Sequence, residues 1–374
     1  MPKSKDAPTL SSFLSEEQLG LLSATGKDLI PEIGLEVVRG VVLDVLCGRN
    51  LRDSTEMLTR RRIAALNLAT VNLFVKGSAQ NPDFVRDLPR MAAQTLSQRA
   101  VTKADKWLAQ WILGLTGKAF QNVLRDDATA LEHYRERYIE TCQRVIANHE
   151  SAYGALRGTL QIDPLTKAQV NWLWMTYLLN TIGAQALAIR GSEKSTYGKL
   201  FEKLILGSLL HILGFKFTTY PPATLDKVFW LASKDEKRES DATLIFQAGK
   251  GARFDIGFIG RGNPEISLDK VSRFEREISL GRSKFFLATL ILVDRIGESS
   301  NIETLARSID GTIIQMSASY WPQLVAKELS RVVGFKHPLI NMPLSKIEAY
   351  LRDKLRNVPL MDFVETKKTD AEED

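Results

Sequence analysis

Two acidic residues mark the stretch Arg253-Phe-Asp-Ile-Gly-Phe-Ile-Gly-Arg-Gly-Asn-Pro-Glu-Ile-Ser-Leu-Asp-Lys270. Asp255 lies inside one apolar run and Glu265 opens the next, and the Gly-rich segment 260–263 separates the two runs. Short apolar runs on either side of a Gly-rich turn are typical of a β-hairpin. The stretch therefore predicts two paired strands, each of which contributes one carboxylate.

The two carboxylates predict a divalent-metal site. A charged side chain in an apolar strand is costly to bury without a partner, and Asp255 occupies such a strand. Mg²⁺ prefers oxygen ligands and keeps several waters, so one or two carboxylates suffice to hold it. We expect Asp255 and Glu265 to bind Mg²⁺ for phosphodiester hydrolysis, with Lys270 supporting the attacking water. The alternative is a surface hairpin whose acids are simply solvated.

Two further acids are candidates for the same site. Glu202 lies in a helical, largely apolar segment and could bind metal or orient a water. It could equally be an ordinary exposed acid paired with Lys199 or Lys203. Asp241 lies at the start of an expected strand, where it could be an alternative metal ligand or support one.

The pattern around this stretch changes from helical to mixed near residues 190–195. From about residue 33 to 190, apolar residues recur at spacings of three and four, which predicts helices. Asp163-Pro164 interrupts this pattern, and Thr166 is expected to cap the helix that follows. After a helix at 196–213, strands are expected at 215–220, 240–247, 252–259, 264–268, 285–294 and 311–317. Helices are expected at 270–280, 300–308, 321–333 and 344–354.

Composition describes a globular chain and excludes several classes. The 374 residues are 44% hydrophobic and 25% charged, and the net charge of +6 is compatible with a polyanionic partner. The two cysteines, Cys47 and Cys142, are expected as buried thiols, and the absence of paired Cys-x-x-Cys units excludes a zinc ribbon. The polar N-terminus is no signal peptide, and no uncharged apolar stretch reaches about 18 residues, so we expect a cytoplasmic protein without a membrane span.

The order of elements over residues 195–320 resembles the PD-(D/E)xK nuclease fold of type II restriction endonucleases. In that order, a helix with Glu202 precedes a strand with Asp255 and a strand with Glu265, followed by a helix and a strand. The segment Asn50-Leu-Arg-Asp-Ser-Thr-Glu-Met-Leu-Thr-Arg-Arg-Arg62 resembles the N-terminal part of CfrBI-type restriction enzymes. By this resemblance Asp255 matches the first acid and Glu265 the second. Ser267 stands where the motif has lysine, so Lys270 would act from the following turn.

The resemblance implies an α/β (α+β mixed) fold with a restriction-endonuclease-like core, whose central mixed sheet is flanked by helices. Residues 1–190 would form a mainly helical domain for DNA recognition or dimerisation, and 191–335 the catalytic domain. Residues 336–374 would add a C-terminal helix and a charged, disordered tail. It also implies Mg²⁺-dependent cleavage of double-stranded DNA at a short palindrome, which calls for a homodimer or a higher symmetric oligomer.

Several basic residues are candidates for DNA contacts. Arg60, Arg61 and Arg62 form a compact cluster that is expected to open a helix, where they could bind phosphate or guanine. The alternative is a solvated basic turn. Four further candidates lie in the expected turn between the acidic strands or in the helix after them: Arg261, Asn263, Arg273 and Arg276.

Two rival functions remain open at this stage. A non-catalytic DNA-binding regulatory protein would bind DNA in a salt-dependent manner without cutting it. A small-molecule enzyme with a doubly wound sheet is disfavoured because no Gly-x-Gly-x-x-Gly or Walker pattern follows a strand. The sequence gives no access to the recognition site.

Overall fold

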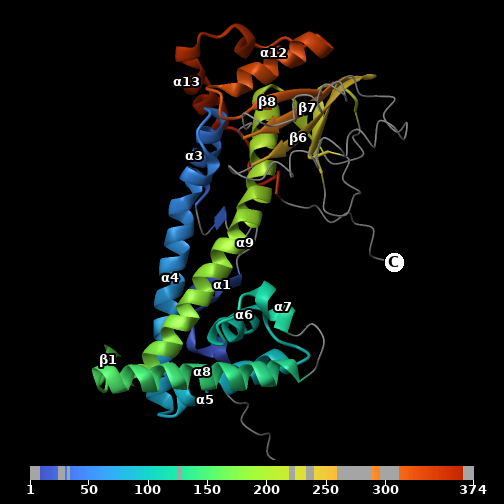
Figure 1. Cartoon of the computed structure of the whole chain (residues 1–374). Helices are drawn as coiled ribbons and strands as arrows, with labels where there is room; N and C mark the ends of the chain where they lie inside the picture. Colours follow the sequence, from blue (N-terminus) through green and yellow to red (C-terminus); the bar gives the residue numbers. More distant parts are fainter. Residues whose placement is uncertain are drawn as a thin grey trace, which may run out of the picture. The chain divides into compact units, whose positions relative to one another are not determined.

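A computed structural model of the chain (Figure 1) describes residues 9–23, 30–31, 34–123, 129–218, 224–232, 240–258, 288–294 and 311–364. The chain divides into two compact units. Unit 1 comprises Met1–Ala24 and Leu58–Lys194, and unit 2 comprises Thr25–Met57 and Ser195–Asp374. The division after Met57 falls inside helix α4 (Leu51–Gln80), and the division after Lys194 falls inside helix α9 (Trp172–Ile212).

Unit 1 is mainly helical. It contains part of α4, the first half of α9, and the following complete elements: η1 (Leu10–Phe13), α1 (Glu16–Ser23), α5 (Phe84–Ser97), α6 (Lys103–Ile112), α7 (Gly117–Val123), α8 (Ala130–Tyr153), β1 (Gly158–Asp163) and β2 (Thr166–Val170). Helices α4 and α9 share its core. The Phe74 and Trp174 rings meet edge to face with centroids 5.6 Å apart, and buried Thr70 donates to Gln185 Oε1 at 2.7 Å.

A β-hairpin interrupts the helices of unit 1. β1 and β2 pair antiparallel, and Asp163 Oδ1 accepts the N–H groups of Leu165 and Thr166 across the turn. Thr166 therefore begins a strand, and the expectation that it caps a helix is wrong. The next helix, α9, begins at Trp172, and its cap is Asn171, whose Oδ1 accepts the Trp174 N–H at 2.9 Å.

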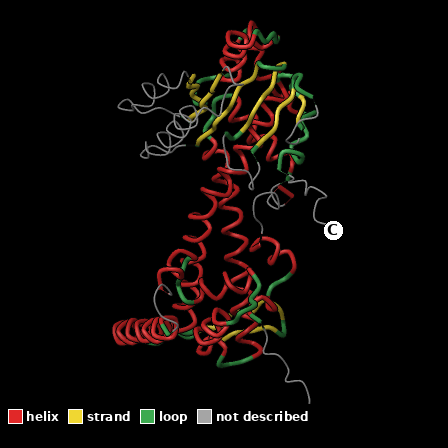
Figure 2. Tube along the Cα trace, turned by 90° about the vertical axis from the view of Figure 1, so that its right-hand side faces the viewer, coloured by secondary structure: helices red, strands yellow, loops and turns green. Residues whose placement is uncertain are grey.

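Unit 2 contains a mixed sheet. Its described strands are β3 (Lys216–Phe217), β4 (Val228–Leu231), β5 (Ala242–Gln247), β6 (Lys250–Gly257), β7 (Ala288–Val293) and β8 (Gly311–Gln315). In the described part of the chain they lie side by side in this order. Figure 2 shows the strands in yellow. β5 is antiparallel to both its neighbours, whereas β6, β7 and β8 run parallel.

One face of this sheet is apolar and packs against helix. Successive strand residues alternate between faces, so Phe254, Ile256, Leu290 and Leu292 share one face, and all four are fully buried. Helix α12 (Trp321–Val333) contacts β6 and β8, and Glu328 on this helix accepts the hydroxyl of Thr312 at 2.7 Å. The expected fold class, a helical N-terminal region followed by a mixed sheet with flanking helices, is confirmed.

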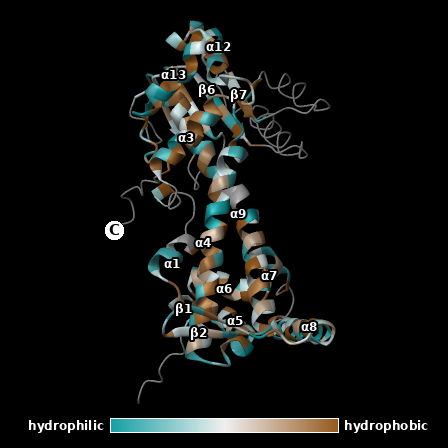
Figure 3. Ribbon diagram, turned by 90° about the vertical axis from the view of Figure 1, so that its left-hand side faces the viewer, coloured by the Kyte–Doolittle hydropathy of each residue, from teal (hydrophilic) through white to brown (hydrophobic). Residues whose placement is uncertain are grey.

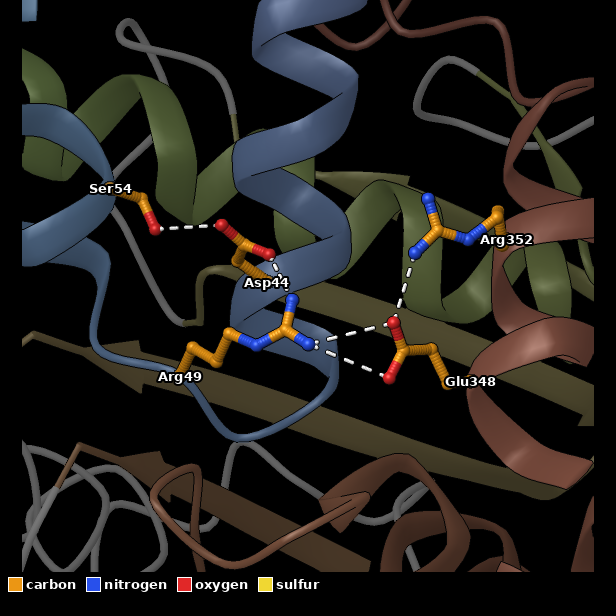
Figure 4. Close-up of polar contacts among 5 residues, drawn as sticks. All are labelled: Asp44, Arg49, Ser54, Glu348 and Arg352. Carbon is orange, nitrogen blue, oxygen red and sulfur yellow. Dashed lines mark hydrogen bonds and ion pairs between the residues drawn. The ribbon is translucent and has the colours of Figure 1, made fainter. Parts of the chain in front are cut away.

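The N-terminal segment of unit 2, Thr25–Met57, packs against its C-terminal helix, and we call this region the corner. This corner joins α3 (Leu35–Leu46) and the start of α4 to α13 (Leu344–Leu355), which follows η3 (Pro338–Asn341). Figure 4 shows its ion pairs. Asp44 accepts from Ser54 at 3.0 Å and pairs with Arg49, and Glu348 contacts Arg49 at 3.5 Å and Arg352 at 2.9 Å. Half-exposed pairs of this kind contribute about 1 kcal/mol or less each.

Beneath these ion pairs the corner is closely packed. The Trp321 indole is buried and donates to Val45 O at 2.7 Å. Gly48 has φ +93°, and a Cβ there would lie 2.7 Å from Ala318 O, so both conformation and space require glycine. Cys47 and Cys142 are free and buried, as expected.

Three sequence expectations need correction or addition. β4 was not expected, and the helix expected at 196–213 is the second half of α9, which runs unbroken through residues 190–195. The expected hairpin of 252–259 with 264–268 is wrong for the described part of β6. Both edges of that strand are occupied along residues 252–256, by β5 and Asp241 on one side and by β7 on the other. Among the helices of the described ranges, none is long and apolar enough to cross a membrane.

Candidate active site

Asp255 lies near the carboxyl end of β6, between an antiparallel and a parallel neighbour. Its register partner on β7 is Ile291, which is buried. On the β5 side, the last register pair is Ala242 with Phe254. Asp241 precedes β5 at a bend, and its N–H bonds to Phe254 O. Asp241 therefore lies beside Asp255 at the end of the β5–β6 ladder.

The face that carries Asp255 is polar on its β5 side. Arg253, two residues before Asp255, shares this face, and its register partner on β5 is Thr243. Exposure is only 4% for Arg253, 8% for Asp255 and 7% for Thr243. The alternative of a surface hairpin with solvated acids is thus wrong for Asp255. An acid and a base on adjacent same-face positions also reduce the cost of burying either charge.

Asp241 bonds to the strands on both of its sides. Its N–H donates to Phe254 O at 3.0 Å, and its Oδ2 accepts the Ile256 N–H at 2.9 Å. Its carbonyl accepts the Ala232 N–H at 3.0 Å from the end of β4. The bonds to β6 hold the two peptide groups that flank Asp255. One oxygen of the Asp241 carboxylate is thereby fixed beside Asp255.

Glu202 lies in the second half of α9, in unit 2, and is half-buried. Its helical neighbours Phe201, Leu204 and Ile205 are fully buried, so this turn of the helix borders the core. Both interpretations of Glu202, site acid and ordinary helix acid, are compatible with this position.

The other predicted site residues divide into two groups. Six lie outside the described residues: Arg261, Asn263, Glu265, Lys270, Arg273 and Arg276. The basic cluster is described and lies in unit 1, well inside α4, so it neither opens a helix nor forms a turn. Arg60 and Arg61 are exposed, whereas Arg62 is only 6% exposed and does not present its side chain to solvent.

Asp241 and Asp255 have the chemistry of a hard-cation site. Two neighbouring carboxylates are sufficient protein ligands for a cation that retains several waters. Within the described ranges, no group of three or more His, Cys, Asp or Glu side chains is arranged to hold a metal. Arg253 was not predicted as part of the site. The signal for it was present, because charges at positions 253 and 255 of an apolar run mark one polar strand face.

A helical region followed by a mixed sheet with acids at a strand end is consistent with a restriction-endonuclease-like core. Comparison with known proteins agrees. Residues 35–301 match the CfrBI restriction endonuclease family, and the chain is 37% identical over 351 residues to the type II restriction enzyme CfrBI of Citrobacter freundii. That alignment covers 93% of this chain and 96% of the relative. No solved structure matches. The chain belongs to the CfrBI restriction endonuclease family, and thus to the type II restriction endonucleases.

Proposed function

We propose that this chain cuts double-stranded DNA at a short specific site by Mg²⁺-dependent hydrolysis. The observation that carries the proposal is that Asp241 bonds to both peptide groups that flank the buried Asp255, in a member of a restriction endonuclease family. Family membership argues against the non-catalytic regulatory protein and against the small-molecule enzyme.

Asp255 and Asp241 are the ligands that we propose for the cation. When bound, the cation supplies charge stabilisation at the scissile phosphate. One oxygen of the Asp241 carboxylate accepts the Ile256 N–H, and this hydrogen bond limits rotation of the side chain. Asp255 is held in the middle of the sheet by β5 and β7, so its position does not depend on a free loop.

The sequence offers further members of this site. We retain Glu265 as a metal ligand, Lys270 as the cation that supports the attacking water, and Glu202 as the acid that orients water. Because β6 has no edge left for a strand at 264–268, Glu265 would have to approach Asp255 other than as its hairpin neighbour. Among the described residues, Asp241 is an acid placed beside Asp255.

DNA contacts are proposed for the exposed basic residues. Arg60 and Arg61 project from α4 into solvent, where guanidinium groups can bind phosphates. Arg62 is a weaker candidate because it is buried. Arg261, Asn263, Arg273 and Arg276 remain candidates from the sequence. A palindromic target would be cut by a symmetric homodimer, and we expect the enzyme to act in the cytoplasm.

Incubation of the purified protein with a sequenced plasmid tests the proposal. With Mg²⁺ we expect discrete fragments whose ends map to one short sequence, and with EDTA intact plasmid. Replacement of Mg²⁺ by Mn²⁺ or Ca²⁺ identifies the cations that support cutting. Retarded but uncut DNA under all these conditions would favour the regulatory protein instead.

A further inference from the structure

The β1–β2 hairpin of unit 1 projects polar side chains that no site described above uses. Every residue of β1 is exposed, and in β2 only the alternate residues Ala168 and Val170 are buried. Ala168 and Val170 belong to the unit 1 core, which anchors β2 by one face. The hairpin is therefore held on one side and presents its other face to solvent. Figure 3 labels both strands at the edge of this unit.

The solvent face of the hairpin is a compact array of hydrogen-bonding groups. Register pairs Thr159 with Gln169 and Gln161 with Lys167, so these four side chains form a two-by-two patch on one face. Thr159 Oγ1 donates to Gln169 Oε1 at 3.3 Å, which orients the Gln169 amide. Amide, hydroxyl and ammonium groups of this kind are those that contact base edges and phosphates.

The charge of this patch matches a polyanion. Lys167 lies in it and Arg157, which is exposed, precedes β1. The only acid between these two cations is Asp163, and its Oδ1 is engaged by the N–H groups of Leu165 and Thr166 in the turn. The patch itself therefore contains neutral and cationic groups without a carboxylate.

We propose that the β1–β2 hairpin is a DNA-reading arm, which places Gln161, Lys167 and Gln169 in a groove of the substrate duplex. The major groove of B-DNA admits a two-stranded ribbon, and glutamine and lysine form bidentate or direct contacts with purine edges there. This proposal rests on the proposed function, because the duplex is the substrate of that reaction. The hairpin adds a source of sequence specificity that is separate from the acids of unit 2.

A second copy of the chain is the competing occupant. Leu160 and Ile162 on β1 are exposed, and Leu165 at the turn is 92% exposed, so the strand could pair with its own copy. Protein interfaces are enriched in aromatic residues and depleted of lysine at their cores. Residues 158–170 contain no aromatic residue, and their solvent face carries Lys167. These features favour DNA.

Binding measurements on paired duplexes test the arm. The probes are two fluorescent duplexes, one carrying the site mapped from wild-type plasmid digestion and one with that site scrambled, in EDTA so that both stay intact. The double variant Gln161→Ala/Gln169→Ala should bind the mapped site about tenfold or more weakly and bind the scrambled duplex unchanged. Lys167→Gln should weaken binding to both duplexes and reduce the salt slope by about one.

Gln143→Ala is the matched control, because Gln143 is an exposed glutamine on α8 of the same unit. If the wild-type protein cuts DNA and the double variant keeps an unchanged preference for the mapped site, the DNA-reading role of the hairpin is overturned. The proposed function is then unaffected. A wild-type protein that yields no fragments with any divalent metal overturns both. Sedimentation velocity decides the competing occupant: a dimeric wild type that becomes monomeric in the Leu160→Lys variant assigns the hairpin to self-association and overturns the DNA-reading role.

Discussion

β6 and β1 place polar side chains in opposite settings. β6 is buried from Gly251 to Gly257, between two neighbouring strands, and still carries Arg253 and Asp255. β1 carries Thr159 and Gln161 on a strand that is exposed at every residue. Buried charges cost free energy, whereas exposed polar groups cost almost none. The burial of charged residues in β6 therefore indicates a function by itself. The polar residues of β1 indicate a function only through the way they are arranged.

Loss of the β6 carboxylate should have the largest effect. Asp255→Ala removes a proposed metal ligand, so single-turnover plasmid cleavage should fall by roughly three orders of magnitude. DNA binding measured in EDTA should stay close to wild type, because the metal is absent from that assay. Lys250→Ala, at the exposed start of the same strand, is the control. Wild-type cutting by Asp255→Ala would remove this residue from the mechanism.

Two substitutions at Asp241 separate charge from hydrogen bonding. Asparagine can still accept the Ile256 N–H but has no charge, whereas alanine loses both. We expect Asp241→Asn to slow cleavage about a hundredfold and to require more metal for half-maximal rate, with unchanged thermal stability. Asp241→Ala should also lose about 1–2 kcal/mol of unfolding free energy. Near-normal cleavage by Asp241→Asn would restrict this residue to holding β6.

Exposed charge should matter less than buried charge. Arg61→Ala removes one exposed guanidinium from α4, so affinity for duplex DNA should fall several-fold and the salt slope by about one. The loss should be the same for specific and scrambled duplexes if Arg61 contacts only phosphate. Fluorescence anisotropy over a salt series measures both quantities. Unchanged affinity across the series would leave Arg61 as ordinary surface charge.

The smallest effect is expected at a buried group outside either site. Burial raises the pKa of the Cys47 thiol to about 11, with a further contribution from the nearby Glu348 carboxylate. At pH 7 only about one thiol in ten thousand is then ionised. Since the thiolate is the reactive species, Ellman's reagent should not label native Cys47 measurably, and labelling should appear in denaturant. Peptide mapping of the product would reveal early labelling that contradicts this.

Much of the fold could be predicted from local patterns. The runs that became β5, β6 and β7 are apolar enough to be expected as buried strands, and α12 and α13 have clear helical periodicity. β4 was missed because only four residues form it. Thr159–Asp163 alternates in polarity as a strand does, but so short an alternation is outweighed by the helical periodicity on both sides of it, so the sequence does not predict β1.

The candidate site was harder to predict than its strands. The acid at 255 was found because a charge in an apolar run is conspicuous. The position of Asp241 beside it depends on the turn between β5 and β6 and on the register shift between Ile245 and Gln247, which no local pattern fixes. The second edge of β6 pairs with β7, which lies far away in sequence, whereas the hairpin expectation assigned that edge to the adjacent segment.

The two strands that neighbour β6, β5 and β7, are expected to pair with it at different stages of folding. β5 is joined to β6 by a tight turn, so Asp241 and Asp255 can meet as soon as residue 257 is available. β7 begins at Ala288, far along the chain from β6, and contacts between residues distant in sequence form slowly. Asp241 and Asp255 can thus come together early during synthesis. β6 gains its second neighbouring strand only when β7 pairs with it.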